Sequence, residues 1–270
     1  MRVARCPAER AELIMNFFTP DKSTTPTTGK SVAHRRTRRD LLELGVGYGL
    51  ILLVIWTPRP LQTVLYYAAI AALVAIFWRC FESWAAMGLR TANFLRSFWI
   101  VGAVFLLAAV AMLVAVRLHT LCVPDSPAVF LKKFWGYIVW SFVQQILLLD
   151  FFLLRLLRLM PRRTSAVAAT AGIFALAHVP NPILAPLTLV WGLVACLIFL
   201  RYRNLYPLAM AHAILGICIA ITVPGPVSHN MRVGLGYLQY RVPRRRYRSQ
   251  SDHIVSTQAW VIAEAPTRRC

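Results

Sequence analysis

The sequence predicts an all-α polytopic transmembrane helix bundle of about seven spans, with an eighth, re-entrant segment as the alternative count. Of its 270 residues, 58% are hydrophobic and only 15% are charged, and the mean hydropathy is +0.58. A soluble domain of this length cannot bury so much apolar surface. The basic residues also fall mostly between long apolar runs, as in proteins whose cytoplasmic loops are positively charged.

Seven apolar runs follow a basic lead-in, and each is an expected helix. They are Leu41–Thr57, Leu61–Trp78, Phe98–Val116, Phe134–Leu154, Thr164–His178, Ile183–Leu200 and Tyr206–Val223. A transmembrane helix needs about 20 predominantly apolar residues, so the fifth run is short. Its alanine and glycine content predicts a helix packed inside the bundle, because small residues let helices approach closely.

The runs divide the chain into four predicted regions. Residues 1–40 are a basic, disordered lead-in without the apolar core of a signal peptide. Residues 41–116 hold three transmembrane helices, residues 134–223 hold a core of four helices, and residues 224–270 form a basic tail.

The distribution of arginine between the runs predicts a cytoplasmic N-terminus. The basic loops assigned to the cytoplasmic side contain Arg35, Arg36, Arg38, Arg39, Arg79, Arg90, Arg96, Arg155, Arg158, Arg162, Arg163, Arg201 and Arg203. Seven spans would place the basic tail on the opposite side, and a re-entrant segment at 227–240 would return it to the cytoplasm.

The net charge of +20 could suggest nucleic acid as a partner, but no nucleic-acid-binding motif accompanies it. The expected partners are membrane lipids. The six cysteines form no C-x-x-C pair, which argues against a zinc knuckle or a redox motif. Cys196 and Cys218 lie within apolar runs and are expected to be packing thiols.

Polar residues inside a membrane are costly and mark candidate functional sites. The fourth run contains Gln144, Gln145 and Asp150, the fifth ends at His178, and the seventh contains His212. Neutral histidine can act as a base, a proton donor or a metal ligand. A purely structural alternative is open: the glutamines are hydrogen-bonding contacts between helices.

In that alternative, Asp150 pairs with Arg155 or Arg158 at the membrane surface. Two other polar residues have simple structural interpretations. Asn181, followed by proline, predicts a turn between the fifth and sixth runs, with a substrate contact as the alternative. Asn204 predicts a cap on the seventh run or a turn into it. Trp191 is expected to be an interfacial or core aromatic residue.

The polar positions resemble those of the CPBP family, which comprises type II CAAX prenyl endopeptidases and bacteriocin-processing intramembrane proteases. That family carries E-E-x-x-x-R, F-x-x-x-H and H-x-x-x-N on successive helices. Here Phe174 and His178 match the second motif, His212 matches the first position of the third, and Gln144 and Gln145 occupy the glutamate positions. The resemblance covers about 134–223.

Four polar residues of the family pattern are replaced. Glutamines stand in place of both glutamates, Leu149 stands in place of the arginine and Gly216 in place of the asparagine. In the family, a glutamate is understood to activate water while the asparagine polarises the scissile carbonyl. An amide cannot be an efficient general base, so the resemblance implies a divergent site.

The resemblance implies an intramembrane peptidase that cuts membrane-embedded or lipidated peptides near the bilayer surface, in the bacterial inner membrane. The expected catalytic residues are Gln144, Gln145, His178 and His212, supported by Phe174, Asp150, Asn181 and Arg155. No cofactor is expected, because zinc would need a ligand pair that the helices do not supply. The alternatives are a pseudo-peptidase that binds without cutting, and a small transporter or lipid-handling protein.

Overall fold

The structure is a computed structural model that describes residues 26–80, 83–85, 87–91 and 93–241. The chain divides into two compact units, 1–42 and 43–270, which are described separately. Of the first unit, the described residues 26–42 are helical and form the beginning of α2. Everything below concerns the second unit.

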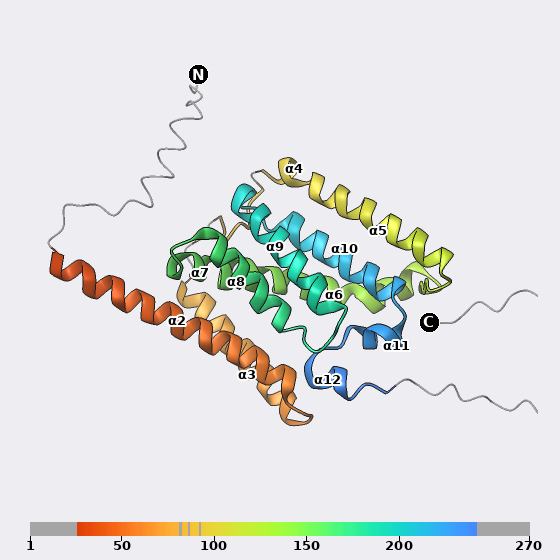
Figure 1. The fold of residues 1–270 in the computed structure, drawn as a ribbon, viewed down its shortest axis with the longest axis horizontal. Helices are drawn as coiled ribbons and strands as arrows, with labels where there is room; N and C mark the ends of the chain where they lie inside the picture. Colours follow the sequence, from red (N-terminus) through yellow and green to blue (C-terminus); the bar gives the residue numbers. More distant parts are fainter. Residues whose placement is uncertain (1–25, 81–82, 86, 92, 242–270) are drawn as a thin grey trace, which may run out of the picture. The chain divides into compact units, whose positions relative to one another are not determined.

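The described chain is all-helical and contains no strand, in agreement with the predicted fold class (Figure 1). The elements are α2 (Pro26–Trp56), α3 (Leu61–Cys80), α4 (Phe94–Ser97), α5 (Trp99–Arg117), α6 (Pro127–Ile146), a π-helix η1 (Leu147–Leu153), α7 (Leu154–Leu159), α8 (Arg163–Leu176), α9 (Leu184–Tyr202), α10 (Tyr206–Thr222), α11 (Gly225–Ser228), a 3₁₀ turn η2 (His229–Met231) and α12 (Gly234–Leu238).

Four helical stretches in the described chain are long and apolar enough to cross a membrane, so the prediction of a membrane protein is supported at this level. They are Leu61–Arg79, Phe94–Arg117, Pro127–Leu159 and Leu184–Tyr202. A fifth is added if α10 and the following Gly225–Met231, which are bent by 119°, count as one span. The predicted count of seven or eight spans is not confirmed.

Two of the expected runs account for the lower count. The run expected at Leu41–Thr57 lies in α2 and contains Glu43 near its beginning, and a charged residue there disfavours a lipid-facing span. Helix α8 has 14 residues, fewer than a bilayer requires. It packs along α9, and Ala171 lies directly against Gly192, where an added Cβ would approach the Ala171 Cα to 3.1 Å.

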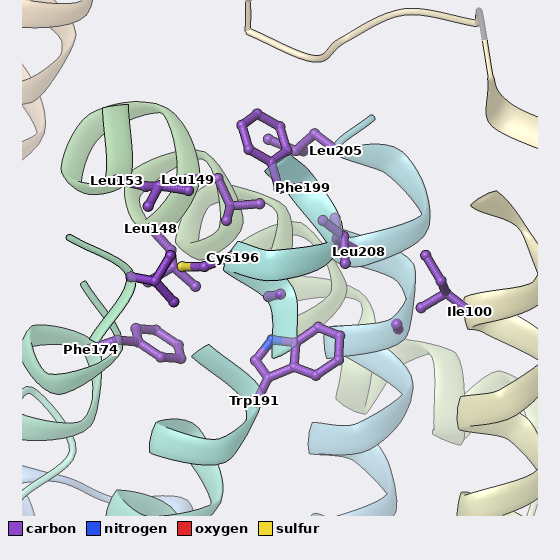
Figure 2. Packing of buried hydrophobic residues seen from close by; sticks show 14 of the residues in the cluster. Ile100, Leu148, Leu149, Leu153, Phe174, Trp191, Cys196, Phe199, Leu205 and Leu208 are labelled. Carbon is purple, nitrogen blue, oxygen red and sulfur yellow. The ribbon is translucent and has the colours of Figure 1, made fainter. Parts of the chain in front are cut away.

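Helix α10 forms the centre of the bundle because it packs against both α5 and α6. The π-helix packs against α8 and α9. The main apolar cluster lies between these elements, and Figure 2 shows it with Leu148, Leu149 and Leu153 of the π-helix opposite Cys196 and Phe199 of α9. Cys196 and Cys218 are buried free thiols, as expected.

The π-helix interrupts the fourth predicted run directly after the paired glutamines. A π-helix closes i→i+5 hydrogen bonds and occurs most often at functional sites. Side-chain directions beyond Ile146 therefore depart from the 100° per residue of an α-helix. All seven of its side chains are buried, including Asp150, which is 6% exposed.

The loop before α4 makes a close backbone contact with the α9–α10 turn. The Leu205 amide donates to the Gly88 carbonyl at 3.0 Å. Gly88 has φ +74°, and a Cβ there would lie 2.7 Å from the Phe199 ring, so glycine is required. Asn204 Oδ1 accepts from the Tyr206 amide at 3.1 Å, so its side chain forms a turn into α10, whose N-cap residue is Leu205.

Candidate functional site

The site is built around a buried hydrogen bond between α6 and α10. Gln145 is fully buried and His212 is 6% exposed. The Gln145 Nε2 and the His212 Nδ1 are 2.7 Å apart. The structure therefore brings together two of the four predicted catalytic residues, which the sequence places on separate helices.

The chemistry of this pair assigns the proton on His212. In this orientation of the Gln145 amide, Nε2 donates, so Nδ1 of His212 accepts and carries no proton. The proton of the neutral ring is then on Nε2. His212 consequently offers an N–H donor on the side of the ring away from Gln145.

His178 is fixed in the opposite tautomer. Its Nδ1 lies 2.7 Å from the Phe174 carbonyl oxygen, which can only accept, so Nδ1 carries the proton. The Nε2 atom of His178 then presents a lone pair. The ring is half-buried in the turn after α8, and burial lowers the pKa of His178 from 6.5, partly opposed by the hydrogen bond to Phe174.

Phe174 links the two histidines. Its ring centroid lies 4.9 Å from that of His178 and 5.9 Å from that of His212, edge-on in both cases. His178 also lies within electrostatic range of His212. The spacing of the F-x-x-x-H motif therefore has a structural explanation. The Phe174 ring packs against both imidazole rings, and the Phe174 carbonyl sets the tautomer of His178.

Trp191 on α9 completes the wall of the site. Its ring centroid is 6.0 Å from that of His212, and Figure 2 shows it with Phe174 at the margin of the apolar cluster. The sequence indicated an interfacial or core aromatic residue here. Two buried polar atoms of the site have no hydrogen-bond partner among the described residues: Trp191 Nε1, a donor, and Gln145 Oε1, an acceptor.

Tyr137 occupies the space beside Gly216, the position that the resemblance assigns to an asparagine. A Cβ built on Gly216 would overlap the Tyr137 hydroxyl. Tyr137 lies eight residues before Gln145 on α6 and Gly216 lies one turn after His212 on α10. The tyrosine hydroxyl is thus the polar group nearest to position 216, which sequence reasoning missed because tyrosine and glycine are distant in the chain.

The Gln144 side chain takes no part in the hydrogen bonds of the site. Its side chain is half-buried and bonds to no other described side chain or carbonyl. Leu149, at the arginine position of the resemblance, is fully buried in the apolar cluster.

Asp150 does not pair with Arg155 or Arg158, and that expectation was wrong. Both of its carboxylate oxygens are buried without a hydrogen-bond partner among the described residues. The charge that acts on it is Arg203, in the α9–α10 turn. The π-helix explains the difference, because it changes the direction of every side chain after Ile146.

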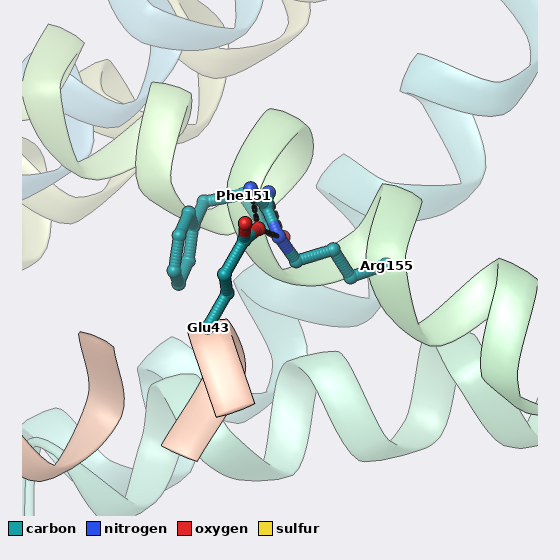
Figure 3. Close-up of polar contacts among 3 residues, drawn as sticks. All are labelled: Glu43, Phe151 and Arg155. Atoms are coloured by element: carbon teal, nitrogen blue, oxygen red, sulfur yellow. Dashed lines mark hydrogen bonds and ion pairs between the residues drawn. The ribbon is translucent and has the colours of Figure 1, made fainter. Parts of the chain in front are cut away.

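Arg155 pairs with Glu43 instead, as Figure 3 shows. Its Nε and NH2 donate to Glu43 Oε2 at 2.9 and 2.7 Å. Its NH1 donates to the Phe151 carbonyl at 3.1 Å, and the guanidinium lies 4.2 Å from the Phe151 ring centroid. Arg155 therefore attaches α7 to α2 and takes no part in the histidine site.

Asn181 is fully buried and all of its hydrogen-bonding groups are used structurally. Its Oδ1 accepts from the amides of Ile183 and Leu184, and its Nδ2 donates to the carbonyls of Ser228 and Arg232. The predicted turn is present. The additional bonds to 228–232 hold the C-terminal segment against the turn that carries His178, which local sequence could not indicate.

Comparisons with known protein families, curated proteins and solved structures find no match to this chain. Among the described residues, no group of three or more His, Cys, Asp or Glu side chains is placed to hold a metal ion. The site must therefore be judged from its own chemistry.

Proposed function

We propose that the chain is an intramembrane peptidase-like protein on a CPBP-type scaffold, with a divergent Gln–His–His site. One observation carries this proposal: the two histidines are held in opposite tautomers. His178 offers a lone pair at Nε2 and His212 offers a proton at Nε2. A base and a hydrogen-bond donor on neighbouring side chains are the minimum set for adding water to a peptide carbonyl.

In the proposed reaction, His178 Nε2 removes a proton from water while the water oxygen bonds to the carbonyl carbon. His212 donates its Nε2 hydrogen bond to the carbonyl oxygen as negative charge develops there. The C–N bond then breaks and His178 returns the proton to the leaving nitrogen, so the step needs no further reactant. Gln145 maintains the tautomer of His212.

The proposed substrates are membrane-embedded or lipidated peptides cut near the bilayer surface. His178 lies in a turn at the end of the short helix α8, not in the middle of a span. We further propose that the arginine-rich end of the bundle faces the cytoplasm of a bacterial inner membrane, with a cytoplasmic N-terminus.

The proposal is tested with the purified protein in proteoliposomes. The probe is a fluorogenic peptide that ends in a farnesylated cysteine and three further residues, alongside the same peptide without lipid. His178→Ala and His212→Ala should each reduce cleavage at least 100-fold, about the contribution of one general acid–base group. His119→Asn, in an exposed turn, is the matched control and should cleave like the wild type. Equal cleavage by all four proteins would refute the proposal.

A specific observation favours a second candidate, a pseudo-peptidase that binds a peptide, lipid or partner protein without cutting it. Both glutamate positions carry amides, and no carboxylate contacts either histidine in the described chain. Gln145→Glu separates the two functions. If cleavage appears only in that variant, the scaffold binds peptides and the natural site does not hydrolyse them.

A further inference from the structure

Arginine side chains gather at one end of the bundle, around the beginning of α5 and the end of α9. They are Arg90, Arg96, Arg163, Arg201 and Arg203. Burial lowers the pKa of Arg203. The nearby Asp150 carboxylate raises this pKa, and the charges of Arg90 and Arg163 lower it. The Asp150 carboxylate acts on Arg203, and five guanidinium groups lie at this end of the bundle, so the local charge is strongly positive.

An aromatic pair lies at the outer edge of this cluster. Trp99, the first residue of α5, donates from Nε1 to the hydroxyl of Tyr202, the last residue of α9, at 3.3 Å. Trp99 is 56% exposed. The Arg201 guanidinium lies 5.7 Å from the Tyr202 ring centroid, and Arg96 lies within electrostatic range of the same phenol. Tryptophan and tyrosine at helix ends lie at the level of lipid headgroups.

Backbone carbonyls, not carboxylates, position the inner arginine. Arg90 donates from Nε to the Arg203 carbonyl at 3.0 Å and from NH2 to the Tyr202 carbonyl at 3.2 Å. Its charge is therefore fixed beside Tyr202 without being neutralised. Arg203 NH1 is buried and has no acceptor among the described residues.

The outer arginines are also without acidic partners. Neither Arg96 nor Arg201 forms an ion pair with a carboxylate in the part of the chain that the structure describes. Two large apolar side chains near Arg96 in the chain are exposed: Leu95 is 85% exposed and Phe98 is 40% exposed. Arginine beside exposed apolar and aromatic groups matches a ligand with an anionic head and an apolar tail.

We propose that Arg96, Trp99, Arg201 and Tyr202 form a binding site for the phosphate headgroup of an anionic phospholipid. We call these four residues the headgroup site. The guanidinium groups bind the phosphate oxygens. Trp99 contacts the glycerol region, and Leu95 and Phe98 contact the upper acyl chains. The proposal is independent of peptidase activity, since none of these residues touches Gln145 or either histidine of the site.

The chain offers a matched control at the other end of the bundle. Lys132 and Lys133, near the start of α6, are exposed and carry the same charge as the two outer arginines. That end is distant because α5 and α10 run from the arginine-rich end toward residue 122, whose amide donates to the Ile221 carbonyl at 2.8 Å.

The test measures binding of short-chain phosphatidylglycerol to the full chain in neutral detergent by native mass spectrometry. Phosphatidylcholine and free glycerol phosphate are the comparison ligands. A basic residue near an anionic surface contributes about 5-fold in affinity. The double variant Arg96→Gln/Arg201→Gln should therefore bind phosphatidylglycerol about 25-fold more weakly, and Lys132→Gln/Lys133→Gln should bind like the wild type.

Three results would overturn the inference. Phosphatidylglycerol binding could be unchanged in the arginine variant, or both double variants could lose affinity equally, which would indicate unspecific charge attraction. Free glycerol phosphate could also bind as tightly as the lipid, which would remove the role of the apolar neighbours. An unchanged thermal unfolding temperature of the arginine variant in phosphatidylcholine verifies that it is folded.

Discussion

The ion pair between Arg155 and Glu43 gives a prediction whose size follows from the structure. The two side chains are 5% and 14% exposed, and Glu43 Oε2 receives two N–H groups of the guanidinium. Removal of one member of a buried, hydrogen-bonded ion pair costs about 3–5 kcal/mol. Replacement of both by apolar side chains of similar size is often nearly neutral.

We expect Glu43→Leu and Arg155→Met each to lower the free energy of unfolding by about 3–5 kcal/mol. For a unit of this size that corresponds to a decrease of about 6–20 °C in the unfolding temperature, at about 2–4 °C per kcal/mol. The double variant should recover to within about 1 kcal/mol of the wild type. The unfolding temperatures of the wild type, the two single variants and the double variant are measured in the same detergent by circular dichroism.

Lys132 is an exposed cation that no carboxylate of the described residues contacts. The variant Lys132→Met is therefore the control for the loss of a positive charge. It should unfold within about 0.5 kcal/mol of the wild type. The reasoning is refuted if the single variants match this control, or if the double variant loses the sum of the two single effects.

Three further changes test the site and its supports by thermal unfolding. Gln145→Leu leaves Nδ1 of His212 buried without a donor and should cost about 1–3 kcal/mol; an unchanged midpoint would contradict the hydrogen bond. Asn181→Asp keeps the acceptor but removes two donated bonds, so we expect a loss of about 2–4 kcal/mol and faster limited proteolysis within 225–241. Gly216→Ala should cost about 1–3 kcal/mol through overlap with Tyr137, and Tyr137→Leu in the same chain should recover part of that loss.

The sequence predicted the helical membrane class and singled out Gln145, His178 and His212, but not how these residues meet. It also grouped Gln144, Arg155 and Asn181 with them, which take no part in the contacts of the histidine site. Hydropathy identifies a helix wherever apolar residues are continuous, which is why α3, α5 and α9 were placed well. It does not show whether a helix faces lipid or protein. The short helix α8 is apolar because it packs on α9, and counting it as a span overestimates the number of spans.

The charged residues show where local reasoning fails. Arg155 was expected to be near Asp150 because they are close in sequence, whereas its partner Glu43 is 112 residues away. The π-helix between Leu147 and Leu153 reorients Asp150, and no residue pattern in the run predicts it. Likewise, Asn181 predicts a turn from its own neighbours, but its bonds to 228–232 depend on the tertiary fold.

The pH dependence of peptide cleavage tests the central claim most directly, because it reports the protonation of the proposed base. The pKa of His178 is lowered by burial from 6.5, so the ring is neutral and able to accept a proton at pH 7. The account predicts that kcat/KM for the farnesylated probe is constant at neutral pH and decreases tenfold per pH unit below that lowered pKa. His178→Ala should abolish this acid-limited activity. Cleavage by His178→Ala at the wild-type rate with the same pH profile would contradict the account.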